Sequence, residues 1–153
     1  MRKQLEALDL GFISFCRMAL IPIARFGLFV IFFWFGFLKV IGLSPASGLV
    51  RSLFERTMPI MTFDVFLILF GAFECLIGIL FLIRGFERIV IPLLFFHMIT
   101  TFMPLFLLPQ VTWSGFMVPT LEGQYIIKNL VIISTAIAIA ANLKPMSSDK
   151  ISG

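Results

Sequence analysis

Four predominantly apolar stretches follow one another along the chain, at about residues 23–43, 63–83, 89–109 and 122–143. A helix needs roughly 20 apolar residues to cross the hydrocarbon core of a bilayer, and each stretch meets that length. Together they account for most of the chain and leave no room for a soluble domain. The pattern therefore predicts an all-α integral membrane protein, a bundle of four transmembrane helices forming a single domain over residues 1–153.

The segment before the first span is amphipathic. Its apolar residues recur at helical spacing while charged residues occupy the other positions, as in a helix that lies in the plane of the membrane interface. Pro22 follows, at a place suited to the first turn of a new helix. We expect an N-terminal interfacial helix with this apolar stripe: Leu5, Leu8, Phe12, Cys16 and Ala19.

Two connecting segments differ in pattern. "SPASGLVRSLFERTMP" opens with a Ser-Pro pair suited to a helix start and places Leu49, Val50, Leu53 and Phe54 along one stripe, which predicts a short amphipathic helix between spans one and two. "PQVTWSGFMVPTLEGQ" has no clear periodicity, which favours a loop held at the interface by Trp113. Such a loop either roofs the bundle or merely connects two spans.

Composition agrees with a membrane location, and charge orients the chain. Of 153 residues, 60% are hydrophobic and 13% charged, and the mean hydropathy is +1.09. Lysine and arginine favour cytoplasmic loops, so both termini are expected in the cytoplasm. The net charge of +4 is then a topology signal rather than a nucleic-acid-binding one. The cations predicted inside are Arg2, Lys3, Arg17, Arg84, Arg88, Lys144 and Lys150, against Arg51 and Arg56 outside.

Charged residues inside the spans are the candidates for function. Lys39 stands in "FFWFGFLKVIG", where an ammonium group near the bilayer centre costs roughly 2.5–3.5 kcal/mol and so requires a partner. Arg25, Gly36 and Lys39 share one helix face, which must point into the bundle. In span two, Glu74 lies near the midpoint, with glycines three residues before and four after it that allow close helix packing.

Spans three and four also carry polar stripes: His97, Thr100, Thr101 and Pro104 in one, and Lys128, Thr135 and Asn142 in the other. Lys39 lies about six residues outward of its span's middle and Lys128 about four, or roughly 9 and 6 Å. We therefore expect both lysines to converge with Glu74 in the outer half of the bundle. Alternatively, Glu74 pairs with His97, or the polar cluster only fixes helix register.

Two cations against one anion would leave an excess positive charge, which favours a small anion or a polarised carbonyl as ligand. The aromatic run Phe32, Phe33, Trp34 and Phe35 offers an apolar slot suited to a quinone. One histidine and two distant cysteines disfavour haem, metal and dithiol chemistry, so no metal site and no covalently bound cofactor are expected. Any electron transfer would have to use a partner's cofactor.

Four blocks of the chain together resemble a known family. They are "ARFGLFVIFFWFGFLKVIGLSP", "GAFECLIGILFL", "TTFMPLFLLPQVTW" and "LEGQYIIKNLVIIS", and their order is similar to that of the DoxX-like superfamily, most of all its YkgB-like, reactive-chlorine-resistance branch. The resemblance implies a four-helix protein of the bacterial inner membrane, associated with quinone-linked redox and oxidative stress. It carries onto Arg25, Trp34, Gly36, Lys39, Glu74, Gly78, Pro104, Pro109, Gly123 and Lys128.

These observations lead to one functional expectation and two alternatives. We expect a membrane subunit, at most a cofactor-free part of an oxidoreductase, that binds a quinone or small anion. The predicted ligand-binding residues are Arg25, Trp34, Lys39, Glu74, His97 and Lys128. Alternatively the same charges line a transport pathway in which Glu74 or His97 carries protons, or the protein is a structural partner. The expected protein partner is a membrane oxidoreductase or a second copy of the chain.

Overall fold

Four long helices make up most of this computed structural model, which describes residues 2–57 and 60–145. They are α1 (Arg2–Val40), α3 (Phe63–Leu82), α4 (Glu87–Phe102) and α7 (Leu121–Ala141). Each of the four, with α4 extended to Leu107, is long and apolar enough to cross a membrane. Helices suit this setting because they satisfy their backbone hydrogen bonds internally. The predicted all-α membrane bundle is confirmed.

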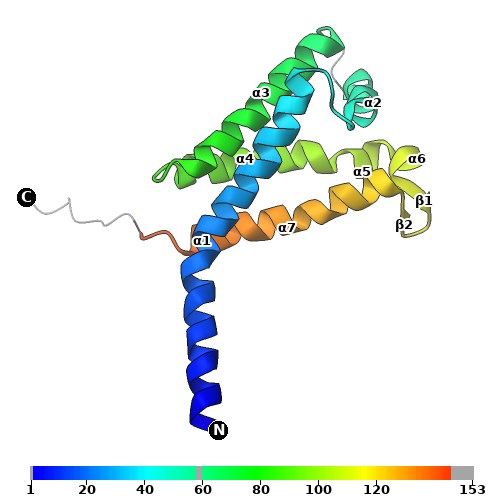
Figure 1. Ribbon diagram of the computed structural model, residues 1–153. Coiled ribbons are helices and arrows are strands. Elements are labelled where there is room, and N and C mark those ends of the chain that lie inside the picture. Colours follow the sequence, from blue (N-terminus) through cyan, green and yellow to red (C-terminus); the bar gives the residue numbers. More distant parts are fainter. Residues whose placement is uncertain (1, 58–59, 146–153) are drawn as a thin grey trace, which may run out of the picture.

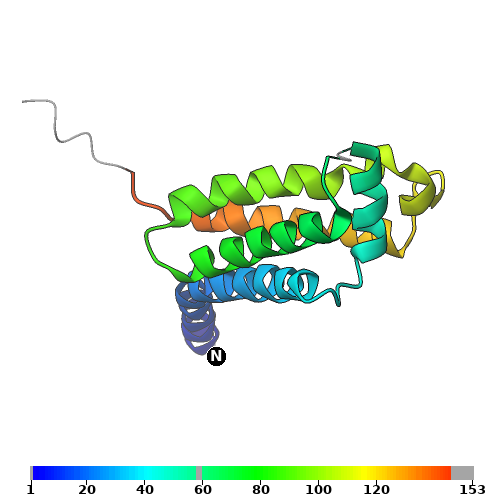
Figure 2. The same cartoon turned by 90° about the horizontal axis from the view of Figure 1, so that it is seen from above.

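The helices are arranged as two pairs. Helix α1 packs mainly on α3, and α4 packs mainly on α7. Figure 1 shows the first pair crossing the second, and Figure 2 shows α3, α4, α7 and the second half of α1 running along one common direction when the bundle is seen from above. The core between the pairs takes residues from every long helix, including Leu28, Phe32, Ile77, Leu94 and Ala136.

The α1–α3 contact is a contact between backbones. A Cβ atom added at Gly36 would lie 2.6 Å from the carbonyl oxygen of Gly71, and one at Gly71 would lie 2.5 Å from the carbonyl oxygen of Gly36. Further along, a Cβ at Gly78 would lie 2.8 Å from the nitrogen of Phe33. No side chain fits at such distances, so these glycines permit the close helix packing predicted on either side of Glu74.

Shorter elements gather at one end of the bundle, which we call the hairpin end (Figure 2). They are α2 (Ser47–Thr57), α5 (Pro104–Leu107), α6 (Pro109–Thr112) and an antiparallel pair, β1 (Trp113–Gly115) with β2 (Val118–Pro119). The opposite end, which holds the turn between α3 and α4, is called the turn end.

The predicted amphipathic helix between the first two spans is present as α2. It begins at Ser47 instead of at the Ser-Pro pair, because residues 44–46 form a turn in which the backbone N–H of Ser47 donates to the carbonyl oxygen of Ser44 at 3.2 Å. Phe54 anchors α2 by packing with Phe63 and Leu67 of α3. Met58 and Pro59, at the end of the predicted segment, lie outside the described residues.

The prediction of an irregular loop between spans three and four is wrong in part. The one-turn helix α6 and the β1–β2 hairpin occupy this segment, whereas α5 lies in the last part of the predicted third span. The proline at the start of α6 fixes a backbone angle that suits a first helical turn, so a helical turn forms here although the segment has no helical periodicity. Trp113 is half-buried, and its Nε1 donates to the carbonyl oxygen of Leu105 at 3.0 Å, which ties the hairpin to α5.

The N-terminal segment is helical as expected, but Pro22 does not start a new helix. It lies inside α1, which runs unbroken from Arg2 to Val40. Proline lacks a backbone N–H and its ring crowds the preceding turn, so it bends a helix. Figure 1 shows the part before this point turning away from the bundle.

Candidate functional site

Glu74 lies between two other polar residues in the bundle interior. Lys39 Nζ donates to Glu74 Oε2 at 2.6 Å, and His97 Nε2 lies 3.3 Å from Glu74 Oε1. The three residues come from α1, α3 and α4, so one carboxylate links three of the four long helices. Both pairings considered for Glu74, with Lys39 and with His97, are therefore present together. We call Lys39, Glu74 and His97 the polar cluster.

The polar cluster is almost fully shielded, with exposed fractions of 6% for Lys39, 6% for Glu74 and 3% for His97. Aromatic rings surround it. The His97 ring centroid lies 5.5 Å from that of Phe32 and 5.1 Å from that of Phe70. Lys39 Nζ also lies 5.6 Å from the centroid of Phe70, within the range of a cation–π contact. Apolar walls around a few converging polar groups are typical of ligand sites.

Hydrogen-bonding capacity remains unused in the polar cluster. Lysine offers three donors, and Glu74 is the hydrogen-bond acceptor for Lys39 Nζ among the described residues. His97 Nδ1 is buried and has no partner within the same part of the chain. Thr100 and Thr101 donate to the backbone oxygen of His97, at 2.7 and 3.1 Å, and not to its ring. A carbonyl oxygen arriving here would find donors already in place.

Arg25 does not join the polar cluster. It is buried on the predicted face of α1, but it lies 14 residues before Lys39, or roughly 21 Å along the helix. Its Nη1 pairs with Glu87 Oε1, and its Nε donates to the carbonyl oxygen of Phe81 at 2.8 Å. Glu87 Oε2 in turn accepts from the backbone N–H of Gly85 at 2.7 Å. This second buried pair fastens α1 to the α3–α4 turn.

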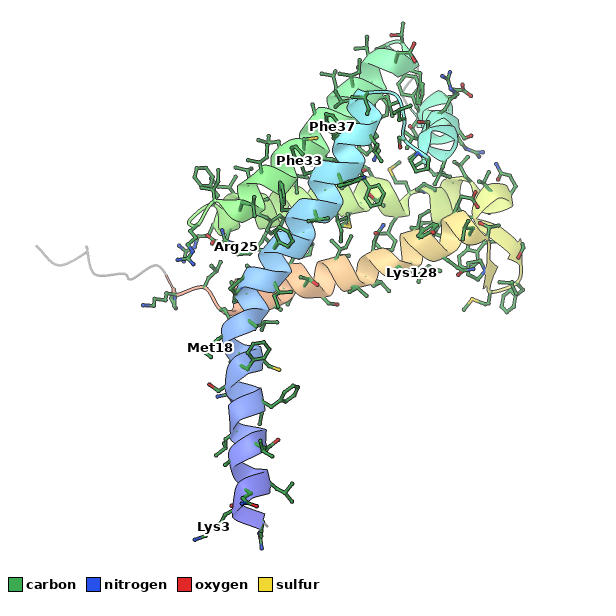
Figure 3. The ribbon with its side chains drawn as sticks, viewed as in Figure 1. Lys3, Met18, Arg25, Phe33, Phe37 and Lys128 are labelled. Carbon is green, nitrogen blue, oxygen red and sulfur yellow. The ribbon has the colours of Figure 1, made fainter. Side chains whose placement is uncertain are left out.

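The expectation that Lys128 converges with Glu74 is wrong. Lys128 is exposed, and its Nζ lies 5.3 Å from the centroid of the Tyr125 ring on the same helix. The buried face of α7 carries Gly123, Ile126 and Ala136 instead. Figure 3 shows Lys128 on a stretch of α7 away from Arg25 and the first pair of helices. The predicted excess of positive charge is therefore absent, because Lys39 and Glu74 compensate each other.

Trp34 is also outside the polar cluster. Its side chain is 64% exposed, because it lies two residues before Gly36 and so on nearly the opposite side of α1 from the α3 contact. Of the predicted aromatic slot, Phe32 alone contacts the His97 ring; Phe33 stacks on its own helix neighbours Phe29 and Phe37. The rings that complete the surroundings of His97, Phe70 and Phe73 of α3, were not predicted.

No family model matches the chain, and no curated protein and no solved structure matches it either. Its function is therefore inferred from the geometry of the polar cluster.

Two apolar grooves on the helix surfaces lie elsewhere. The larger, of about 500 Å³, is lined by residues of α4 and α7 such as Phe95, Phe102 and Ile133. The smaller, of about 240 Å³, lies between α1 and α7 beside Gly27 and Thr135. Neither groove is lined by a residue of the polar cluster. Apolar grooves of this kind suit acyl chains. They are therefore alternative sites, besides the polar cluster, at which an apolar ligand could bind.

Proposed function

We propose that the protein binds a quinone at the polar cluster and supports quinone-linked redox or oxidant defence. One observation carries the proposal: the Glu74 carboxylate is held between a lysine and a histidine, amid phenylalanine rings, deep inside a membrane bundle. Ionisable groups in this position are costly and usually serve a function. His97 Nδ1 is buried without a partner among the described residues, as is Nη2 of Arg25 in the other buried pair, so the aromatic surroundings of His97 and not this nitrogen favour a ligand site.

The unused donors favour a neutral carbonyl ligand over an anion. Quinones carry two carbonyl oxygens on a planar ring, and Lys39 Nζ retains donors that would suit one of them. The surrounding rings of Phe32, Phe70 and Phe73 would contact the ring faces. A small anion, the other ligand considered, loses its main support because the charges of Lys39 and Glu74 cancel.

Proton exchange is the chemistry that this chain would add. Reduction of a quinone to a quinol takes up two electrons and two protons. Glu74 and His97 are groups that exchange protons, whereas the electrons would come from a partner oxidoreductase that holds its own redox cofactor. The chain would then act as a cofactor-free subunit. Resemblance to the DoxX-like superfamily and its YkgB-like branch belongs to the same proposal.

The proposed setting is a bacterial inner membrane with both termini in the cytoplasm. An even number of spans places both termini on one side, and that side would hold the cation-rich turn end, in keeping with the preference of lysine and arginine for the cytoplasm. Lys150, which was among the cations predicted to lie on the cytoplasmic side, lies outside the described residues. The polar cluster would then lie toward the outer, hairpin end.

A quinone titration tests the proposal. A short-chain quinone at roughly 100 times its Kd should stabilise the purified protein by about 2.7 kcal/mol, which corresponds to a rise in melting temperature of roughly 5–10 °C. The double variant Lys39→Met, Glu74→Gln removes the charges of the cluster together and should lose this rise. Lys128→Gln should keep it, because Lys128 lies on the surface.

The other buried pair supplies the matched control. Arg25→Met with Glu87→Gln makes the same kind of change at the turn end and should lower the melting temperature while leaving the quinone-dependent rise intact. If the cluster variant keeps the rise as well as this control does, the polar cluster is only structural. Proton or solute uptake by reconstituted vesicles without any quinone effect would favour the transport alternative.

A further inference from the structure

The first half of α1 carries an apolar face that none of the described elements covers. Residues 2–18 are all exposed, and Figure 1 shows them projecting from the bundle. Leu8, Phe12 and Phe15, spaced by four and three residues, lie on one face of the helix with exposed fractions of 71%, 67% and 61%. We call residues 2–20 the arm. An apolar stripe of this length marks a surface that contacts something apolar.

Helix α1 is too long to be a membrane span over its whole length, so the arm is not part of the first span. The 39 residues of α1 extend about 58 Å at 1.5 Å per residue, whereas the hydrocarbon core is about 30 Å thick. Figures 1 and 3 show the arm running across the direction of α7 from a bend near Met18. Because α7 is long and apolar enough to span a membrane, a helix that runs across its direction at the end of the bundle suits a position along the membrane surface.

The apolar stripe faces the bilayer side of the arm. In Figure 3, Lys3 points away from the side on which the bundle lies. Phe12 is nine residues from Lys3, which is two and a half helical turns, so the two side chains lie on opposite faces of the helix. The stripe that contains Phe12 is thereby turned toward the side on which the bundle lies.

The charges complement an anionic surface. The arm and the turn end together carry six cations against two anions, and the buried Arg25–Glu87 pair cancels. The half of the bundle nearer the hairpin end carries equal numbers of both signs, and the Lys39–Glu74 pair cancels. The charges of the first group are Arg2, Lys3, Arg17, Arg84, Arg88 and Lys144 with Glu6 and Asp9; those of the second are Arg51, Arg56 and Lys128 with Glu55, Asp64 and Glu122.

We infer that the arm and the turn end form a docking surface for anionic phospholipids of the same membrane. The stripe lies at the boundary between headgroups and acyl chains, and the cations contact lipid phosphates, as amphipathic helices and basic segments beside a membrane do. This surface is independent of the quinone site, because it uses none of the residues of the polar cluster.

Spin labels on two faces of the arm test its position. In a Cys75→Ser background, a nitroxide on the native Cys16 reports from the apolar stripe. A nitroxide on Ser14→Cys, with Cys16→Ser, reports from two residues away, roughly 200° around the helix. In nanodiscs we expect the label at 16 to be accessible to oxygen dissolved in lipid and the label at 14 to a water-soluble nickel chelate. Access of the chelate to both labels would place the arm in water and overturn the inference. Dipolar broadening of the label at 16 would also overturn it, because it would indicate that a second copy of the chain packs on the arm.

Lipid charge is tested by a matched pair of variants. Nanodiscs with phosphatidylglycerol should give a higher melting temperature than nanodiscs of phosphatidylcholine alone. Lys3→Gln with Arg17→Gln should reduce this difference, whereas Arg56→Gln with Lys128→Gln, which removes two exposed cations from the half of the bundle nearer the hairpin end, should leave it unchanged. Equal effects of the two variants, or no difference between the lipids, would contradict an anionic-lipid surface.

Discussion

Lys39→Met should lower the free energy of unfolding by about 3–5 kcal/mol, because it leaves the buried Glu74 carboxylate without its nearest counter-charge. Adding Glu74→Gln removes that charge and should restore part of the loss, so the double variant should be more stable than Lys39→Met alone. The hydrogen bond of 2.6 Å between the two side chains is the physical basis of this coupling.

A double-mutant cycle in detergent measures the coupling. Unfolding of the parent, both single variants and the double variant would be followed by circular dichroism. Residues that contact each other show coupling energies of about 0.5–3 kcal/mol. A cycle between Lys39→Met and Glu87→Gln is the control and should be additive, because Glu87 belongs to the other buried pair. Additivity in both cycles would show that Lys39 and Glu74 do not interact.

Gly71→Ala should destabilise the α1–α3 contact by about 1–3 kcal/mol, which is the usual effect of adding atoms to a packed core. Its Cβ would lie 2.5 Å from the carbonyl oxygen of Gly36 and 2.8 Å from Cβ of Lys39, so the two helices would have to separate. That separation would also pull Lys39 away from Glu74. The variant should therefore lose quinone-dependent stabilisation as well as stability.

Gly27→Ala is the matched control for this change. Gly27 lies in α1 as Gly36 does, but a Cβ there would meet no atom within 4 Å. Alanine is the better helix former by about 1 kcal/mol, so this variant should be as stable as the parent or more so. The measurement is the melting temperature of Gly71→Ala and of Gly27→Ala, each compared with that of the parent. Equal stability of Gly71→Ala and the parent would contradict the close approach of α1 to α3.

Length and composition were sufficient to predict the four spans, because the bilayer imposes a minimum apolar length on any crossing helix. Spacing also predicted the buried face of α1, from Arg25 through Gly36 to Lys39. Depth then placed Lys39 roughly 9 Å outward of the level of Glu74, a separation that two long side chains can span. These predictions succeed because a charged group and a glycine each restrict where a helix face can point in lipid.

Depth alone failed for Lys128, because a residue at the right level can still lie on the wrong face. The predicted polar stripe of α7 is satisfied locally and needs no partner helix: Thr135 Oγ1 donates to the carbonyl oxygen of Val131 at 2.7 Å, and Asn142 Nδ2 donates to that of Ala138 at 2.8 Å. Polar residues that bond to their own helix give the same sequence pattern as residues that face a neighbour.

The role of Glu87 was missed because its partner, Arg25, is 62 residues away in sequence. One signal was present: Glu87 follows the glycine at position 85, in the short turn after α3, and stands in the first turn of a new helix, where a negative charge is favourable. Pairing it with Arg25 required knowing that α1 crosses the α3–α4 turn. That crossing follows from packing between the two helix pairs, which sequence spacing does not define.

Photo-crosslinking with an azido-substituted quinone tests the central claim most directly. In nanodiscs, illumination followed by mass spectrometry identifies the residues that contact the quinone ring. A quinone site at the polar cluster predicts labels on Phe32, Phe70 and Phe73, around His97, that disappear in the Lys39→Met, Glu74→Gln variant. Labels confined to the groove beside Phe95, Phe102 and Ile133, unchanged in that variant, would contradict it.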